Sequence, residues 1–379
     1  MRENVRIYLS PPHMSGIEMT HVNKAFETNW IAPTGPDIVE FEKEVCRYTG
    51  AAHAVALSSG TAAIHLALKA GGVGAGDDVY CSNFTFAGTV FPVEYCGANL
   101  ILVDCEMKSW NMDPEMLREA IDNSRKTGHT PKAVVLVHLY GQSADTAEIL
   151  KICNDNGVLL IEDAAESLGA YNGNLATGTM GDFGIYSFNG NKIITTSGGG
   201  MLVGRNKDMV ETVRYLSTQA RDPFPYYEHS NIGYNYRMSN ILAAIGRGQM
   251  MVLEKRIQRR REIFRLYSDL FSKEKGITMM PNDCYGRSNC WLSCILIDDE
   301  KTGKKPEDIR LELEEMNIES RPLWKPMHLQ PVFKSYPVFS QGVSDELFKK
   351  GLCLPSGTAM DNETISRVAT LVLDSVNRG

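Results

Sequence analysis

Short apolar runs alternate with amphipathic segments through the first half of the chain. Seven runs have the length and composition of strands: HAVAL (53–57), DVYCS (78–82), LILVD (100–104), AVVLVHL (133–139), VLLIED (158–163), FGIYSF (183–188) and GMLVG (200–204). Helical patterns separate the first five of these runs from one another. Strands that are apolar along their whole length are buried on both faces, as in a parallel sheet covered by helices. The pattern therefore predicts an α/β fold with a mostly parallel seven-stranded sheet.

The pattern changes after residue 205. A long helical region follows over 239–271, and its charged centre, EKRIQRRRE, is typical of a solvated helix face. From about residue 285 the chain continues with one apolar run, CWLSCILID, and two helical segments, PEDIRLELEEMNI and NETISRVATLVLDSV. We therefore expect a large α/β domain over 1–249, including the N-terminal segment, and a small C-terminal α+β domain over 250–379.

Composition and charge narrow the class of protein. The chain has 379 residues, a formal net charge of −7 and nine cysteines. The negative charge disfavours nonspecific binding to nucleic acid or to an anionic membrane. The cysteines are scattered and odd in number, which indicates free thiols in a reducing compartment and no metal site. The N-terminus lacks the apolar core of a signal peptide and no stretch resembles a membrane span, so we expect a cytoplasmic protein.

Two glycine-containing turns are candidates for an anion site. The first, SSGT (58–61), separates a strand from a helix. Free N–H groups at a helix start, hydroxyls and a glycine that permits close approach can bind an anion. An ordinary helix N-cap is the alternative, because Ser and Thr are preferred there. The second, GGVGAG (71–76), follows a helix, which favours a helix end and a turn over a dinucleotide-binding loop.

Asp163 and Lys192 both follow apolar strands, at the ends beyond which open α/β sheets bind ligands. A carboxylate at 163 can hold a protonated heterocyclic nitrogen; alternatively it caps a helix, whose face Glu166 could share. Ser187 can offer a hydroxyl to a phosphate, and the Lys192 amine can form a Schiff base with a bound aldehyde. A phosphate site, a pyridinium partner and a lysine in this order are what pyridoxal phosphate (PLP) needs.

These motifs resemble those of the DegT/StrS-type nucleotide-sugar aminotransferases, PLP-dependent enzymes of fold type I. The matching segments extend over essentially the whole chain: WIAPTGPDIVEFEKEV, ALSSGTAAIHLAL, IEDAAESLGA, GDFGIYSFNGNKIITTSGGGM and NIGYNYRMSNILAAIG. SRPLWKPMHLQPVF (320–333) also resembles members that act on UDP-linked 4-keto-6-deoxy-N-acetylhexosamines in bacterial glycan (bacillosamine-type) pathways, which serve protein glycosylation. The resemblance implies that the domain over 1–249 binds PLP.

The resemblance also implies which residues hold the cofactor. Lys192 matches the lysine that forms the Schiff base, and Asp163 matches the carboxylate that keeps the pyridine nitrogen protonated. Phe86, in NFTFAGTV, matches the aromatic residue that stacks on the ring. The positions that match the phosphate-binding residues are Gly60, Thr61 and Ser187.

Other matching positions concern the partner subunit and the substrate. Glu166 matches a cofactor-binding position that often carries His or Gln in relatives. Asn235, in GYNYRM, matches an asparagine that reaches the phosphate from the neighbouring subunit, which implies a homodimer with shared active sites. The implied substrate-binding residues, for which surface turns and domain packing are the alternative, are Trp30, Thr34, Lys325 and His328.

The activity that the resemblance implies is transfer of the amino group of L-glutamate to the C4 keto group of a nucleotide sugar. The cofactor would alternate between PLP and pyridoxamine phosphate, and Lys192 would move the proton. A GDP- or dTDP-linked keto-sugar, or a 3-keto sugar, is an alternative acceptor. A sugar dehydratase is disfavoured, because relatives of that class carry histidine in place of the lysine. A non-catalytic regulatory or sensor protein is disfavoured by the presence of Lys192, Asp163 and Ser187.

Overall fold

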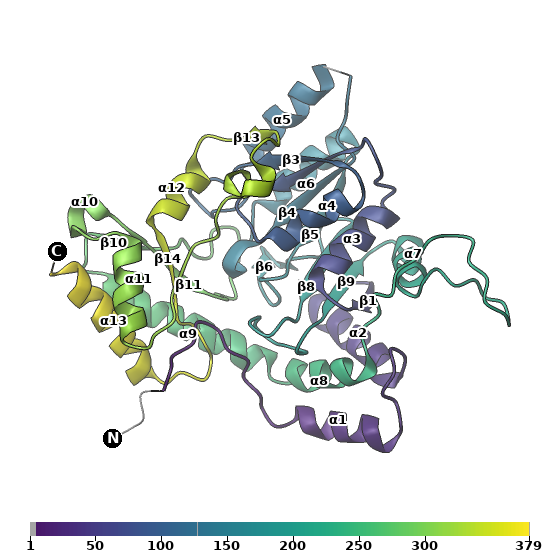
Figure 1. The fold of residues 1–379 in the computed structure, drawn as a ribbon, viewed down its shortest axis with the longest axis horizontal. Helices are drawn as coiled ribbons and strands as arrows, with labels where there is room; N and C mark the ends of the chain where they lie inside the picture. Colours follow the sequence, from purple (N-terminus) through teal and green to yellow (C-terminus); the bar gives the residue numbers. More distant parts are fainter. Residues whose placement is uncertain (1–4, 127, 379) are drawn as a thin grey trace.

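A large sheet and a small sheet organise the chain in the computed structural model, which describes residues 5–126 and 128–378 (Figure 1). The large sheet has the strand order β1-β9-β8-β5-β4-β2-β3-β13. Its strands are β1 (His53–Leu57), β2 (Asp78–Ser82), β3 (Asn99–Val103), β4 (Ala133–Val137), β5 (Leu159–Asp163), β8 (Phe183–Ser187), β9 (Gly200–Gly204) and β13 (Val338–Phe339). The small sheet contains, in spatial order, β10 (Ile277–Met279), β11 (Ser293–Ile297), β14 (Gly351–Leu354) and β12 (Arg321–Pro322). A two-stranded ribbon consists of β6 (Tyr171–Asn172) and β7 (Leu175–Ala176).

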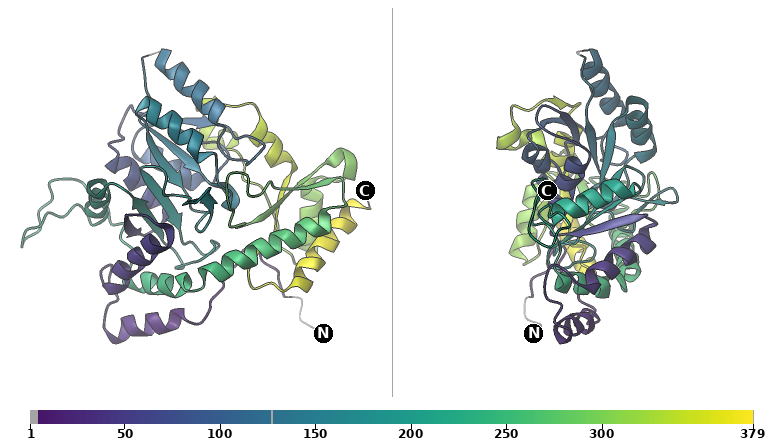
Figure 2. Two further views of the ribbon diagram at one scale, coloured as in Figure 1. Left: turned by 180° about the vertical axis from the view of Figure 1, so that it is seen from behind. Right: turned by 90° about the vertical axis from the view of Figure 1, so that its right-hand side faces the viewer.

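Helices pack against both sheets (Figures 1 and 2). Those before residue 250 are α1 (Glu18–Glu27), α2 (Pro36–Thr49), α3 (Gly60–Ala70), α4 (Phe91–Tyr95), α5 (Pro114–Lys126), α6 (Thr146–Asn156), α7 (Lys207–Ser217) and α8 (Asn240–Met250). Those after it are α9 (Leu253–Phe271), α10 (Asp299–Thr302), α11 (Pro306–Glu315), α12 (Val343–Lys350) and α13 (Asn362–Val376). The expected helical region over 239–271 therefore contains two consecutive helices, α8 and α9.

The large sheet is mostly parallel, as expected. β2 pairs in parallel with β3 and β4, and β5 pairs in parallel with β4 and β8. β9 runs antiparallel between β1 and β8. The seven apolar runs all form strands, but β13 adds an eighth, parallel to β3. The expected number of seven is corrected to eight; a strand of two residues is too short to show an apolar pattern.

Local signals set the connections between strands and helices. Ser59 caps α3, because its hydroxyl accepts a hydrogen bond from the Ala62 N–H at 3.0 Å. Asp145 caps α6 in the same way. Gly157 ends α6 with φ 66°, a left-handed conformation that glycine adopts without strain. Residues 71–76 form turns after α3, as expected.

The C-terminal part of the chain forms a second core around the small sheet. Ile263 of α9, Ile295 of β11 and Val368 of α13 are fully buried in it. Figure 2 shows α9 extending from α8 toward α13. Ile7 pairs with Ile318, and β13 joins the large sheet, so segments from both chain ends cross between the two parts. The division at residue 249 stays a prediction. In the described part of the chain, no helix is both long and apolar enough to cross a membrane.

Candidate active site

A cavity of about 460 Å³, here called the cofactor pocket, lies at the carboxyl ends of β5 and β8 and at the start of α3. Parallel strands end at one edge of the sheet, so residues distant in the sequence converge there. Its lining includes seven of the residues expected to bind the cofactor: Gly60, Thr61, Phe86, Asp163, Glu166, Ser187 and Lys192. These residues therefore form one site in the folded chain.

The start of α3 forms a corner of the cofactor pocket that is suited to an anion. N–H groups in the first turn of a helix have no acceptor within the helix, and the helix dipole favours negative charge there. A Cβ at Gly60 would lie 3.4 Å from the Cβ of Ser187, so the serine hydroxyl borders the turn. A Cβ at Gly200 would lie 2.4 Å from the carbonyl carbon of Ser59, so only glycine fits. Ser59 is therefore an N-cap that also lines the cofactor pocket, and the anion-site interpretation of SSGT stays a prediction.

The carboxylate of Asp163 is buried at the end of β5. Its Oδ2 accepts a hydrogen bond from the Thr89 hydroxyl at 2.7 Å, and its Oδ1 accepts one from the Ala165 N–H at 3.1 Å. Burial raises the pKa of Asp163, although Thr89, Ala165 and the charge of Lys192 oppose the rise. Turns follow Asp163 instead of a helix, so the helix-cap alternative and the shared helical face with Glu166 are wrong. Among the residues that the structure describes, Asp163 forms no ion pair, and a buried carboxylate of this kind is suited to hold a cationic ring nitrogen.

Glu166 and an indole ring hold the amine of Lys192. Lys192 Nζ lies 3.4 Å from Glu166 Oε1 and 4.2 Å from the centre of the Trp291 ring. The other oxygen of Glu166 accepts a hydrogen bond from the Tyr140 N–H at 2.7 Å. Burial raises the pKa of Glu166, and the charge of Lys192 opposes this. The amine thus faces the cofactor pocket with its position defined by two side chains.

Aromatic residues form one wall of the pocket. Phe86 lies 5.4 Å from Trp324, measured between ring centres, and both line the pocket. Trp324 was not singled out from the sequence, although it lies inside the SRPLWKPMHLQPVF segment. Thr89 was also missed, although it belongs to the NFTFAGTV segment around Phe86. No local signal indicated Trp291, because it meets Lys192 only through the tertiary fold.

Asn235, Trp30 and Thr34 lie outside the cofactor pocket. Thr34 and Asn235 line a separate cavity of about 720 Å³, together with Arg221 and Arg237. Trp30 is 43% exposed and does not line the cofactor pocket. Within one chain, these three residues are therefore not brought to Lys192.

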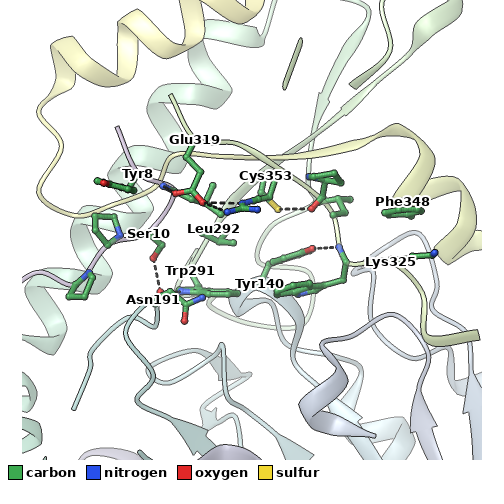
Figure 3. Close-up of a pocket in the computed structure, with 17 residues that line it drawn as sticks. Tyr8, Ser10, Tyr140, Asn191, Trp291, Leu292, Glu319, Lys325, Phe348 and Cys353 are labelled. Atoms are coloured by element: carbon green, nitrogen blue, oxygen red, sulfur yellow. Dashed lines mark hydrogen bonds and ion pairs between the residues drawn. The ribbon is translucent and has the colours of Figure 1, made fainter. Parts of the chain in front are cut away.

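A larger cavity of about 780 Å³ adjoins the cofactor pocket and is here called the outer cavity (Figure 3). It shares Asn191 and Trp324 with the cofactor pocket, and Lys325 lies on its wall. His328 lines neither cavity. Its ring contacts Asn83, and its Nε2 lies 3.1 Å from Asp345 Oδ1, so this histidine joins the C-terminal part of the chain to β2. The structure supports the domain-packing alternative for His328.

Glu162, the first of the two carboxylates in the VLLIED run, has a structural role. Glu162 is fully buried and its Oε2 lies 2.9 Å from His138 Nε2. It also accepts hydrogen bonds from the backbone N–H groups of Gly178, Met180 and Gly181. Burial acts to raise the pKa of Glu162, but His138 and the backbone N–H groups of Gly181 and Gly178 lower it overall. Two adjacent carboxylates in the sequence thus face different surroundings, and only Asp163 lines the cofactor pocket.

Known proteins resemble this chain along almost its whole length. The sequence profile of the DegT/DnrJ/EryC1/StrS aminotransferase family matches residues 12–373. EpsN of Bacillus subtilis (strain 168), which carries the provisional name pyridoxal phosphate-dependent aminotransferase, is 48% identical over 372 residues, covering 97% of this chain and 95% of EpsN. The GDP-perosamine synthase of Caulobacter vibrioides is 35% identical over 377 residues, covering 99% of this chain and all of that protein (100%). The crystal structure of DesI in the presence of its TDP-sugar product has a TM-score of 0.91 at 25% identity, covering 100% of this chain and 94% of that chain.

Fold and pocket together define a PLP-dependent aminotransferase. The chain belongs to the DegT/DnrJ/EryC1/StrS aminotransferase family, as the sequence resemblance implied. It is a sugar aminotransferase, its cofactor is PLP, and the family implies a nucleotide sugar and an amino donor as substrates. The pocket fits this cofactor, because it offers a phosphate corner at Gly60, a buried carboxylate at Asp163 and an amine at Lys192.

Proposed function

We propose that this protein transfers the amino group of L-glutamate to the C4 keto group of a UDP-linked 4-keto-6-deoxy-N-acetylhexosamine. The product is a UDP-4-amino-4,6-dideoxy sugar. The convergence of Lys192, Asp163 and Ser187 on one cavity carries the aminotransferase part of the proposal. The UDP-sugar part is supported by segment 320–333, which resembles enzymes acting on such sugars and contributes Lys325 to the wall of the outer cavity.

The residues of the pocket divide the work of the reaction between them. The Gly60 turn and the Ser187 hydroxyl would bind the phosphate, and Phe86 would contact the cofactor ring. When bound, pyridoxal phosphate supplies an electron-withdrawing ring that accepts electrons from the substrate carbon. Asp163 keeps the ring nitrogen protonated, and burial strengthens this interaction by excluding water. Lys192 would hold the cofactor between reactions and would move a proton at its Nζ atom.

Other acceptors of the same chemical class remain alternatives. The relatives include a GDP-perosamine synthase and a protein with a TDP-sugar product, so GDP- and dTDP-linked keto-sugars are the competing substrates. Product formation with L-glutamate should be measured against UDP-, GDP- and dTDP-linked 4-keto-6-deoxy sugars at equal concentration. We expect the highest kcat/KM with the UDP-linked N-acetylhexosamine. Activity confined to GDP- or dTDP-linked sugars would reject the UDP assignment and leave the aminotransferase assignment intact.

Lys325→Ala should raise the KM for the nucleotide sugar about ten-fold and change kcat little. The reason is that a diphosphate bound by Lys325 carries the same charge in the ground state and in the transition state. Steady-state kinetics with the nucleotide sugar varied at saturating L-glutamate measure this. Lys334→Ala is the matched control, because Lys334 is exposed in the same part of the chain and does not line the outer cavity. An equal KM in both variants would remove Lys325 from the diphosphate site.

A homodimer with shared active sites is also part of the proposal. The segment between α7 and α8 extends away from the rest of the chain (Figure 1). It exposes large apolar side chains, including Tyr227 at 79% and Ile232 at 89%, as a surface that a second chain would cover. Asn235 lies in this segment, outside the cofactor pocket of its own chain. Asn235 can therefore contribute to a cofactor site only in another copy.

Mixing two inactive variants tests the shared site. A Lys192→Ala chain and an Asn235→Ala chain, each strongly impaired alone, should regain activity together. Random exchange at equal amounts would restore about one quarter of the sites, because half the dimers are mixed and each has one intact site. As a control, Lys192→Ala mixed with the double variant should stay inactive. No recovery despite proven subunit exchange would count against a shared site.

A further inference from the structure

The carbonyl group just before Lys192 is held from two distant parts of the chain. The Asn191 carbonyl oxygen accepts a hydrogen bond from the Ser10 hydroxyl at 2.6 Å and another from Trp291 Nε1 at 2.8 Å (Figure 3). Residues 188–199 form turns and bends, with neither helix nor strand. These two hydrogen bonds therefore fix a backbone that secondary structure leaves undefined.

One buried guanidinium holds both donors. Arg260 of α9 is 2% exposed; its Nη2 donates to the Ser10 hydroxyl at 2.7 Å and its Nη1 donates to the Trp291 carbonyl at 2.8 Å. Nη1 also donates to the carbonyl of Ser356. The Ser10 hydroxyl thus accepts from Arg260 and donates to Asn191, which orients it. Arg260, Ser10, Trp291 and Asn191 form a connected hydrogen-bond network, here called the Arg260 network.

The charge of Arg260 is not balanced by a carboxylate. Within residues 5–126 and 128–378, Arg260 forms no ion pair. Burial, helped by the charge of Arg256, lowers the pKa of Arg260 to about 9, so the side chain still carries its charge at neutral pH. A buried charge that only carbonyl and hydroxyl groups compensate destabilises a fold. The planar guanidinium offsets this cost by donating several hydrogen bonds in a fixed geometry, which a lysine side chain cannot do.

The same network also reaches the backbone of Glu166, whose side chain lies beside Lys192. The backbone N–H of Trp291 donates a hydrogen bond to Asn289 Oδ1 at 2.9 Å. Asn289 Nδ2 in turn donates one to the backbone carbonyl of Glu166 at 3.0 Å. The Trp291 ring itself lies under Lys192 Nζ. A displacement of Trp291 would therefore change the backbone before Lys192, the ring below its amine and the support of Glu166 together.

We propose that Arg260 is a positioning residue that fixes the Lys192 amine for covalent binding of the cofactor, acting through Ser10 and Trp291. This inference rests on the proposed role of Lys192. The Arg260 network joins three segments to Lys192: the N-terminal segment, α9 and the loop before β11. Docking of the N-terminal segment then contributes, through Ser10, to holding the backbone at Lys192.

The test compares Ser10→Ala, Trp291→Phe and their double variant. Each single variant leaves the Asn191 carbonyl one donor, and the double variant leaves it none. The readouts are the rate at which apoprotein mixed with PLP develops the visible band of the lysine-bound cofactor, and the wavelength of that band. We expect each single variant to slow attachment a few-fold and the double variant to slow it by more than the product of the two, because either donor alone still holds the Asn191 carbonyl and only the double variant leaves it without a donor from this network. Ser10→Thr, which keeps the hydroxyl, should restore most of the rate.

Tyr267→Phe is the matched control. Tyr267 lies on α9 and donates a hydrogen bond to the Pro355 carbonyl at 2.9 Å, next to Ser356 but outside the Arg260 network. Its loss should lower the thermal unfolding temperature without slowing PLP attachment. Arg260→Lys keeps the charge but loses the paired donors of the guanidinium, so it should slow PLP attachment as the double variant does. If Arg260→Lys does not fold, the Ser10 and Trp291 variants still test the inference. If the double variant attaches PLP at the wild-type rate and with the wild-type band, the inference is overturned and Lys192 remains the cofactor lysine. If PLP attaches to another residue of the wild type, the inference and the role of Lys192 are both overturned.

Discussion

Lys192→Ala is expected to abolish repeated turnover. The variant lacks both the amine that holds the cofactor between reactions and the group that moves the proton, and loss of a positioned acid–base alone lowers rates by about 10²–10⁴. The reduction in kcat should therefore be on the order of 10⁴ or greater. Product formation from L-glutamate and the keto-sugar over many enzyme equivalents measures it. The visible band of lysine-bound cofactor should also be lost.

Lys192→Arg separates the amine's chemistry from its charge. An arginine keeps a cation near Glu166, which lies 3.4 Å from the lysine amine in the wild type. A guanidinium stays protonated and cannot attack an aldehyde, so this variant should be as inactive as Lys192→Ala. Many turnovers by either variant would mean that another lysine binds the cofactor.

Asp163→Ala or Asp163→Asn should lower the transamination rate by roughly 10²–10³, the usual cost of losing one preorganised electrostatic contact. The carboxylate is the group that keeps the ring nitrogen protonated, and without it the ring is a weaker electron acceptor. Single-turnover kinetics of the L-glutamate half-reaction measure this directly. Asp182→Asn is the matched control, because Asp182 precedes β8 at the opposite end of the strand and accepts a hydrogen bond from Leu160 N–H at 2.9 Å.

Substitution of Asp163 should lower the reaction rate without lowering the folding stability of the apoprotein. Burial raises the pKa of Asp163, so its contribution to folding stability is complete below the pKa of the unfolded chain and is lost as pH rises through the folded value. An asparagine at position 163 has no charge to bury. The Asp163→Asn apoprotein should therefore be at least as stable as the wild-type apoprotein at neutral pH. Added PLP should raise the unfolding temperature more in the wild type than in the variant. Near wild-type rates with Asp163→Ala would refute its role at the ring nitrogen.

The sequence could predict the large sheet and most of the cofactor pocket because both depend on local patterns. Apolar runs define the strands, and residues at their carboxyl ends meet at one edge whatever the rest of the chain does. Asp163, Ser187 and Lys192 are found in this way. The sequence did not reveal that Glu166 lies in a turn, because a carboxylate three residues after Asp163 also fits the face of a helix.

Residues that act through tertiary contacts could not be predicted. Ser10, Arg260 and Trp291 come from three distant segments, and each has an ordinary local sequence context. β13 is too short for a periodic pattern, and the contact of His328 with Asp345 depends on how the C-terminal part docks. A basic residue in a matching segment therefore indicated a substrate site at Lys325 and at His328 alike, although Lys325 lines the outer cavity and His328 does not.

Borohydride reduction followed by peptide mapping tests most directly whether the cofactor pocket is the active site. Reduction fixes PLP to the amine that holds it, and mass spectrometry of the peptides identifies that residue. We expect one adduct per chain, on Lys192. An adduct on a different lysine, or none in a preparation that aminates the keto-sugar, would contradict the assignment.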